Sequence, residues 1–314
     1  MKNHISLFIF AIALLSGPVS ANDLSMTAVK DTLASIPGEH NYIYVRTPLG
    51  EDEEKNYDEI TFYDGLGREL DFAQSYGADR AGAIMAHHHL IEYDSLGRKE
   101  KQWLSTNTSF SYMSPEDLKG GVLWDYHDAG KRSYLQTNYE SSPLNRITEQ
   151  YGVGDAWGDH PARMEYLTNI PADSLRCSFY FIDDNDSLIR RGDYRSGELQ
   201  VTKATDEDGK PTYTFVDKQG RTLLTRLGRG NQQADTYFVF DRFGRIRYVL
   251  PPMINDEISA GNLDLYAYQY LYDSFGRCIS KKLPGCAAIG YVYDKADRVI
   301  LSQNGNQSQK KEWT

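Results

Sequence analysis

Tyr63-Asp64-Gly65-Leu66-Gly67-Arg68 is one copy of a six-residue pattern that recurs along this chain. Each copy, or hexad, has an aromatic residue, Asp, two variable residues, Gly and Arg. The other close copies are Tyr93-Asp94-Ser95-Leu96-Gly97-Arg98, Phe240-Asp241-Arg242-Phe243-Gly244-Arg245 and Tyr272-Asp273-Ser274-Phe275-Gly276-Arg277. Two looser copies are Val216-Asp217-Lys218-Gln219-Gly220-Arg221 and Tyr293-Asp294-Lys295-Ala296-Asp297-Arg298. A recurrence on this scale indicates a repeat architecture.

Each hexad predicts the turn of a β-hairpin. The Asp side chain can accept a backbone N–H two residues further on, as in an Asx-turn. The two variable residues suit a type I turn, and the Gly that follows suits the positive φ of a G1 bulge. The residue before Asp ends one strand and Arg begins the next. In the last copy Asp297 stands where the others have Gly.

The segments before the turns are rich in β-branched and aromatic residues, which are typical of strands. Examples are 60–63, 236–240 and 289–293. An isolated hairpin is marginally stable in water, whereas stacked hairpins share one sheet. The sequence therefore predicts an all-β protein built as a hairpin array.

Two short helices interrupt the predicted strands. Ser114 can cap a helix that begins at Pro115, with Asp117 in the capping-box position, and this helix is expected to end near Tyr126. A second short helix is expected within 252–260.

The composition narrows the class of protein. The chain has 314 residues, a net charge of −10 and no cluster of Lys or Arg of the kind that a nucleic-acid surface needs. It holds 23 Tyr against 12 Phe, and Tyr suits sheets with one hydrated face.

Residues 1–21 are expected to be a signal peptide, so the mature chain is expected to be secreted or at the cell surface. Lys2 supplies the positive charge, 5–15 the apolar stretch, and Val19-Ser20-Ala21 a cleavage site. The apolar stretch is too short to span a bilayer, and we expect no stable membrane span after signal removal.

Three cysteines remain, and export permits disulfides. Cys278 and Cys286 flank a plausible turn at 281–285, so they either face each other across a hairpin as a disulfide or remain free thiols. Cys177 is left over in either case.

Several longer segments resemble the YD-repeat, or RHS-repeat, family of bacterial secreted proteins. They are 149–157, 205–209, 250–253, 281–285 and 291–298, and the similarity extends over about 40–313. The resemblance implies hairpin strips that spiral into a shell, which often encloses a C-terminal toxin used between competing bacteria. Other family members are thought to bind carbohydrate at cell surfaces.

The resemblance divides the chain into a signal peptide at 1–21, a β-rich RHS-associated region at 22–200 and YD/RHS hairpin repeats at 201–314. It implies an open, curved part of a shell whose partners are the remaining shell, a C-terminal effector or surface glycans. The downstream RHS core, with its self-cleavage region, and the effector are missing from this sequence. The chain therefore resembles an N-terminal piece or a truncated relative.

Several patterns invite a site of chemistry, and each also has a structural explanation. His87 and His89 would share one face of a strand and could begin a metal site, or they simply belong to a structural strand. Asp183-Asp184-Asn185-Asp186 lacks the EF-hand spacing and favours a turn, as does 206–209. Arg191-Gly192-Asp193 matches a cell-adhesion tripeptide, but three residues occur by chance too often to indicate adhesion.

No spacing nominates a catalytic triad, and no phosphate loop or dinucleotide motif occurs. We therefore expect neither an enzyme nor a cofactor. Two functions stay open, a structural shell module and a module that binds carbohydrate or protein through exposed aromatic faces. Trp103, Trp124 and Trp157 support the second.

Overall fold

The computed structural model describes residues 33, 36, 38, 40–48, 56–78, 84–127, 130–172, 174–228, 233–254 and 256–314. The expected signal peptide lies outside these residues. The chain forms two compact units, the first ending at Pro161 and the second comprising Ala162–Thr314. The division expected at residue 200 follows from the family resemblance and stays a prediction.

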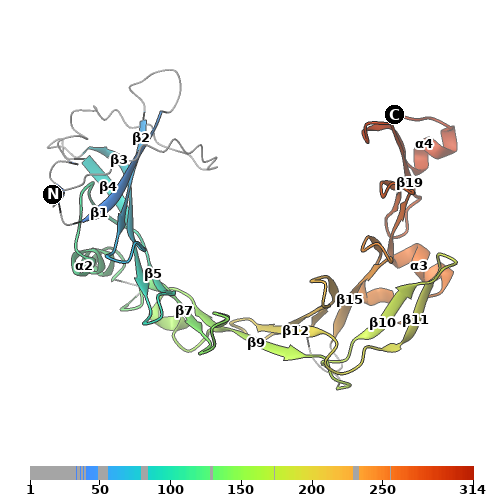
Figure 1. The fold of residues 1–314 in the computed structure, drawn as a ribbon, viewed down its shortest axis with the longest axis horizontal. Coiled ribbons are helices and arrows are strands. Elements are labelled where there is room, and N and C mark those ends of the chain that lie inside the picture. Colours follow the sequence, from blue (N-terminus) through green and yellow to red (C-terminus); the bar gives the residue numbers. More distant parts are fainter. Residues whose placement is uncertain are drawn as a thin grey trace. The chain divides into compact units, whose positions relative to one another are not determined.

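The first unit is an antiparallel ladder. Strand β4 pairs with β3 along one edge and with both β5 and β6 along the other, and β5 continues the ladder to β7 and β8. The strands are β1 (Asn41–Pro48), β2 (Asn56–Tyr63), β3 (Glu69–Ala78), β4 (Ile84–Tyr93), β5 (Lys99–Trp103), β6 (Thr106–Ser109), β7 (Tyr134–Tyr139) and β8 (Ile147–Tyr151) (Figure 1).

Side chains of the first unit alternate between a buried face and a hydrated face, as a pleated strand requires. Along β2 the buried positions include Ile60 and Phe62, and along β4 they include Ile84 and Ala86. These residues form one core with Phe110, which is fully buried.

Helix α2 (Pro115–Asp125) covers β4 and β6. It begins as the sequence predicts, because the Ser114 side chain accepts a hydrogen bond from the Asp117 backbone N–H at 3.1 Å. Leu118 and Val122, one helical turn apart, are buried beneath it. A short 3-10 helix, η2 (Asp155–Trp157), follows β8.

The second unit is also an antiparallel ladder, in which β9 pairs with β12 and each later strand pairs with the next. The strands are β9 (Ala162–Thr168), β12 (Gln200–Thr205), β13 (Pro211–Val216), β14 (Thr222–Leu227), β15 (Ala234–Phe240), β16 (Ile246–Leu250), β17 (Tyr268–Tyr272), β18 (Cys278–Lys282), β19 (Ile289–Tyr293) and β20 (Val299–Gln303). Within the described strands neither ladder closes on itself, so each sheet is open and the all-β class is confirmed.

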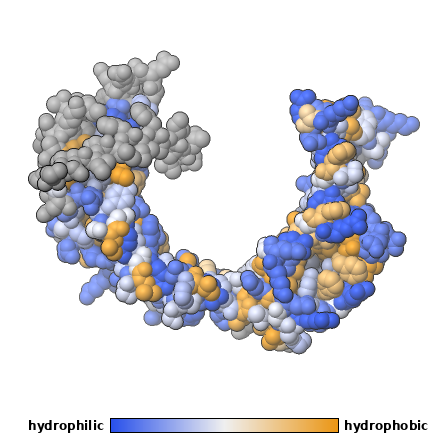
Figure 2. Space-filling model, viewed as in Figure 1, coloured by the Kyte–Doolittle hydropathy of each residue, from blue (hydrophilic) through white to orange (hydrophobic). Residues whose placement is uncertain are grey.

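A separate hairpin of β10 (Ser178–Ile182) and β11 (Leu188–Asp193) packs against β15. Tyr180 and Leu188 of this hairpin enter one core with Tyr237 and Val239 of β15. Figure 2 shows apolar side chains as patches among polar ones on the visible face of this unit.

The helix expected within 252–260 is largely displaced along the chain. Only a 3-10 turn, η4 (Pro252–Ile254), forms there, and helix α3 (Ala260–Tyr266) begins where the prediction ended. The reason is its cap, because Ser259 accepts a hydrogen bond from the Asn262 backbone N–H at 3.2 Å. Helix α4 (Gly305–Lys310) was not anticipated. Among the described residues no helix is long and apolar enough to cross a bilayer.

Candidate functional site

The first hexad forms a hydrogen-bonded turn between β2 and β3. The Asp64 backbone N–H donates to the Arg68 carbonyl at 2.9 Å, and the Gly67 N–H donates to the Asp64 carbonyl at 3.0 Å. Asp64 Oδ1 accepts the backbone N–H groups of Leu66 and Arg68, both at 2.9 Å. Its Oδ2 accepts from Arg68 Nε at 2.7 Å. One carboxylate therefore accepts three hydrogen bonds within its own turn.

The other hexads repeat these bonds almost atom for atom. The Asp backbone N–H donates to the Arg carbonyl in the turns that begin at Asp94, Asp217, Asp241, Asp273 and Asp294. The fifth residue has positive φ, which only Gly adopts without strain: Gly67 77°, Gly97 80°, Gly220 79°, Gly244 78° and Gly276 84°. Asp297 takes the same conformation at φ 60°.

Four of the six hexad Arg residues also reach the aromatic residue of the next hexad, and Arg98 reaches Tyr139, which is not part of a hexad. The Arg245 guanidinium carbon lies 4.8 Å from the centroid of the Tyr272 ring, and the Tyr272 hydroxyl donates to the Ile246 carbonyl at 2.9 Å. The other stacked pairs are Arg68 on Tyr93 at 4.5 Å, Arg98 on Tyr139 at 4.7 Å, Arg221 on Phe240 at 5.1 Å and Arg277 on Tyr293 at 5.1 Å. The aromatic and the Arg of the pattern therefore link successive hairpins.

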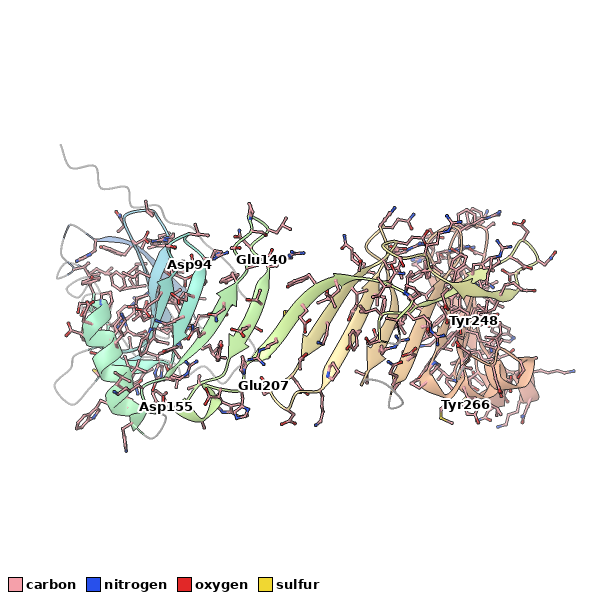
Figure 3. The ribbon with its side chains drawn as sticks, turned by 90° about the horizontal axis from the view of Figure 1, so that it is seen from below. Asp94, Glu140, Asp155, Glu207, Tyr248 and Tyr266 are labelled. Carbon is pink, nitrogen blue, oxygen red and sulfur yellow. The ribbon has the colours of Figure 1, made fainter. Side chains whose placement is uncertain are left out.

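A hydrogen bond from the Nη1 of the hexad Arg strengthens this link between hairpins. Arg98 donates to the Glu140 carbonyl at 2.9 Å, and Arg277 donates to the Asp294 carbonyl at 3.2 Å. Figure 3 shows Asp94 and Glu140 at one edge of the first unit, with Asp155 at the other. The hexad turns of a unit thus form a row at one end of its strands.

Three further turns have the same kind of backbone hydrogen bond but do not match the hexad sequence. Asp183 and Asp206 begin turns in which Ser187 and Lys210 replace Arg. Glu140 begins a turn that is two residues longer, and its carboxylate accepts from Arg146 Nε at 2.7 Å. The signal for the first two is an Asp followed three residues later by Asp or Gly.

The fourth hexad position carries an exposed apolar side chain in several turns. Phe243 is 67% and Phe275 81% exposed, and Leu66, Leu96 and Leu144 hold equivalent positions. Sequence reasoning treated this position as merely variable.

The hydrogen bonds lower the pKa of the hexad carboxyl groups. For Asp64 and Asp94 the backbone N–H of the hexad Arg is the largest cause. For Asp217, Asp241 and Asp273 partial burial opposes the shift, and the hydrogen bonds together outweigh it. In the related turn, the side chains of Arg146 and Ser142 lower the pKa of Glu140 to about 2.

His87, His88 and His89 lie in strand β4, where successive side chains alternate between the two faces of the sheet. His88 is buried between the Asp71 carboxylate, 2.6 Å from Nδ1, and the Ser109 carbonyl, 2.9 Å from Nε2. His87 stacks on Tyr76 on the opposite face. Among the described residues no three His, Cys, Asp or Glu side chains gather as metal ligands would.

The three cysteines are free, so of the two alternatives for Cys278 and Cys286 the structure has the free thiols. The register of β18 on β19 pairs Ser280 with Gly290 and Lys281 with Ile289. Continuing that register places Val292, not Cys286, opposite Cys278. Cys177 is buried, and burial raises the pKa of its thiol to about 12.

The tryptophans named from sequence differ in exposure. Trp103 is partly buried, and its indole N–H donates to Glu92 Oε2 at 3.0 Å. Trp124 is 83% and Trp157 47% exposed. Arg191 and Asp193 belong to β11, where the Arg191 guanidinium stacks on Phe181.

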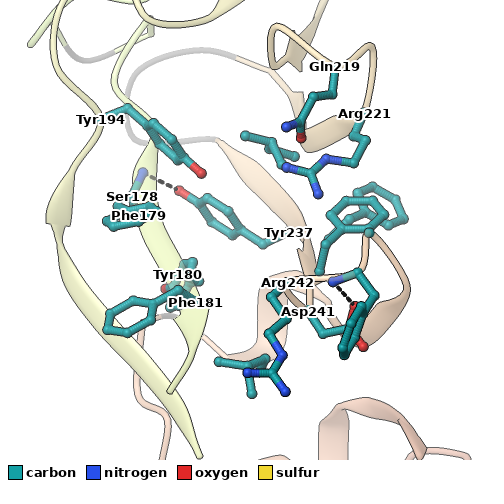
Figure 4. Close-up of a pocket in the computed structure, with 16 residues that line it drawn as sticks. Ser178, Phe179, Tyr180, Phe181, Tyr194, Gln219, Arg221, Tyr237, Asp241 and Arg242 are labelled. Atoms are coloured by element: carbon teal, nitrogen blue, oxygen red, sulfur yellow. Dashed lines mark hydrogen bonds between the residues drawn. The ribbon is translucent and has the colours of Figure 1, made fainter. Parts of the chain in front are cut away.

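A cavity of about 620 Å³ lies between strand β10 and Tyr194 on one side and strands β14 and β15, with the hexad turns at Asp217 and Asp241, on the other (Figure 4). Half of its lining residues are aromatic, with Phe179 and Tyr194 on the hairpin side and Tyr237 and Phe240 on the sheet side. Gln219, Arg221 and Arg242 supply polar groups. No motif in the sequence predicts this cavity.

A comparison of the sequence with known families gives a match over part of the chain. A family model described as a domain of unknown function, DUF6443, matches residues 41–168. Among curated proteins none matches the sequence.

Solved structures give a broader match. The crystal structure of TcdB2-TccC3-Cdc42 superimposes with a TM-score of 0.54 at 14% identity, over 89% of this chain and 13% of that chain. TcdB2-TccC3 without its hypervariable C-terminal region gives 0.53 at 14%, over 84% and 12%. This chain thus spans only a small part of those proteins. The likeness supports an RHS-like fold, in agreement with the resemblance seen in the sequence.

Proposed function

We propose that the chain is a non-catalytic module of the β-hairpin shell of a secreted RHS-type protein. In this proposal it forms the N-terminal part of the shell, and the shell encapsulates or presents a C-terminal effector. The RHS-like fold supports a shell-like structural role. The observation that carries the proposal is the set of contacts from four hexad Arg residues to the aromatic residue of the next hexad.

These contacts suit a wall better than a catalytic site. The hexad Asp and Arg side chains are hydrogen-bonded to each other within their own turns. They are therefore not placed to act as an acid–base pair on a substrate. The repeated contacts instead tie one hairpin to its neighbour, which is what a continuous protein wall requires.

The shell proposal is tested on the complete native gene product, purified from the producing cells. Limited proteolysis followed by mass spectrometry should show a C-terminal segment that is cut only after denaturant opens the protein. Cleavage of every segment at the same rate in native buffer would contradict encapsulation. A hydrolase screen should show no turnover that one point substitution abolishes.

A second candidate function is binding of surface carbohydrate through exposed aromatic side chains. It is favoured by Trp124, whose indole projects from α2 with Leu123 and Tyr126 also exposed beside it. A glycan array probed with the native protein and with Trp124→Ala tests this function. Binding that the substitution abolishes would support it, and an array without signal would contradict it.

A further inference from the structure

The β10–β11 hairpin is attached to the rest of the second unit without a backbone ladder. Its two strands form a sheet of their own, and neither pairs with another of the described strands. Figure 1 shows the hairpin beside the ladder that contains β12 and β15. A lone hairpin is marginally stable, so this one depends on side-chain contacts with the ladder. It can therefore move without breaking the sheet beside it.

The base of the hairpin is anchored on both sides. Just before β10, the Arg176 carbonyl accepts from Arg226 Nη1 at 2.9 Å. Just after β11, the buried Asn169 side chain donates to the carbonyls of Tyr194 and Arg195 at 3.3 and 2.8 Å. These bonds fix the two chain segments that lead into the hairpin, so a movement of the hairpin would turn about its base.

An ion pair holds the tip of the hairpin. Both carboxylate oxygens of Asp186 accept from the Arg247 guanidinium of β16, and the Nη2–Oδ2 distance is 2.7 Å. The Arg247 side chain is 8% exposed, and its Nε donates to the Tyr270 carbonyl at 2.8 Å. The Asp186 side chain is 61% exposed. The Arg is thus fixed in the sheet, whereas the Asp belongs to the hairpin and is open to water.

Asp186 occupies a backbone position that favours Gly. Its φ is 64°, and it is the fourth residue of the turn in which the Asp183 N–H donates to the Ser187 carbonyl. The close hexads have Gly at this place, because a side chain is strained there. The same replacement occurs at Asp297, whose φ is 60° and whose carboxylate accepts from Arg277 Nη1 at 2.9 Å. At both turns the Asp binds an Arg of another hairpin, a contact that Gly cannot make.

The ion pair lies next to the aromatic cavity. Asp186 and Arg247 line a hollow of about 210 Å³, and this hollow shares Phe243 with the lining of the cavity. Across the cavity, Phe179 of the hairpin and Phe240 of the sheet belong to opposite walls (Figure 4). Release of the tip would therefore separate the two walls and open the cavity from this side.

Contacts in the middle of the hairpin also keep it against the sheet. The Tyr180 ring packs edge-on against Tyr237 with the centroids 4.9 Å apart, and the Tyr180 hydroxyl donates to Asp256. The Ser178 N–H donates to the Tyr237 hydroxyl at 3.4 Å, which is long for a hydrogen bond. Because these contacts act together with the ion pair, loss of the ion pair should raise the open fraction without unfolding the unit.

We propose that the β10–β11 hairpin is a lid over the aromatic cavity and that the ion pair of Asp186 and Arg247 is its latch. The lid turns about its anchored base, and its opening admits a small apolar molecule to the aromatic walls. The proposal goes beyond the shell role and does not depend on it.

Asp186→Gly tests the latch without straining the turn, because Gly adopts positive φ freely. Hydrogen–deuterium exchange of the full chain should show the amides of 178–193 exchanging about tenfold faster than in the parent, as loss of a charge-assisted hydrogen bond permits. Peptides from β12 to β14 should keep the parent rate. Nile red, a neutral apolar dye, should associate with the variant faster than with the parent in stopped-flow fluorescence.

Asp297→Gly is the matched control, because it removes the same kind of ion pair at a turn outside the cavity lining. Exchange at 178–193 and dye association should equal those of the parent, and circular dichroism melting shows that each variant is folded. The proposal is overturned if Asp186→Gly leaves either rate unchanged or if exchange rises equally from β12 to β14. The same increases in Asp297→Gly would also overturn it.

Discussion

The guanidinium of Arg245 lies over the ring of Tyr272, 4.8 Å from its centroid, although the two residues belong to different turns. The same guanidinium is held by Asp241 at 2.7 Å and lies 4.9 Å from Phe243. Arg245 therefore closes its own turn and contacts the next hairpin with one side chain. Arg suits this double role better than Lys, because its planar group can form several hydrogen bonds and stack on a ring.

The positive φ of the hexad Gly should be measurable as a stability difference. Gly67→Val forces a β-branched residue into the left-handed region and should cost about 1–3 kcal/mol in the free energy of unfolding. No atom lies within 4 Å of a Cβ at Gly67, so the cost arises from the backbone. Urea denaturation followed by tryptophan fluorescence measures it.

Gly65→Val in the same turn is the matched control. Gly65 lacks positive φ and also has no atom within 4 Å of an added Cβ, so its substitution should change stability by less than about 0.5 kcal/mol. Equal effects at the two positions would show that the turn geometry is assigned wrongly.

The buried pair of His88 and Asp71 should behave as a unit. His88→Leu leaves the Asp71 carboxylate buried without its partner, and its Oδ1 already has no hydrogen bond within the described residues. The expected cost is about 3–5 kcal/mol. Replacing both residues with Leu should recover much of that loss, as thermal and urea unfolding can show. His87→Asn, on the opposite face, is the control, and a double variant as unstable as the single one would contradict the pairing.

Acid should destabilise the turns. The pKa of each hexad Asp is lowered in the folded chain, so folding favours the ionised form. The stabilisation is therefore complete above the ordinary Asp pKa of about 4 and is lost as pH falls through the lowered folded values. Asp241→Asn should reduce the slope of unfolding free energy against pH below about pH 4.

Asp184→Asn is the control for this measurement. Its carboxylate is exposed at the β10–β11 turn and makes no hydrogen bond to any described residue. The acid slope of this variant should match the parent. A parent whose stability stays constant through the acid range would contradict the role of the hexad carboxylates.

The three thiols should react at different rates. Cys286 is exposed and should be alkylated first, Cys278 more slowly, and Cys177 only on unfolding, because burial raises its thiol pKa to about 12. Intact-mass analysis without reductant should account for three thiols. A mass lower by two hydrogens, with Cys278 and Cys286 unreactive, would show that they pair after all.

The turns could be predicted from sequence because their bonds are local. Asp64, Gly67 and Arg68 satisfy one another within one turn, so the spacing alone specifies the conformation. The turn at Glu140 was missed because it is two residues longer. Helix α3 was misplaced because Ser259, not the earlier Pro252, provides its cap.

The cavity could not be predicted from sequence, because its walls come from distant parts of the chain. It forms only when β10 and β11 fold onto β15, which brings Ser178 to Tyr237. Likewise, the recurring aromatic residue gave no indication that it stacks on the Arg of the preceding hexad. That contact depends on which hairpins become neighbours in the sheet.

A double-mutant cycle on Arg245 and Tyr272 tests the link between hairpins most directly. Urea unfolding of Arg245→Met, Tyr272→Leu and the double variant isolates their coupling from the effect of Arg245 on its own turn. The account predicts a coupling of about 0.5–1 kcal/mol for this pair. Arg221 and Tyr293, which belong to hexads that are not neighbours, should show none. Strictly additive effects for Arg245 and Tyr272 would contradict the view that each Arg joins its hairpin to the next.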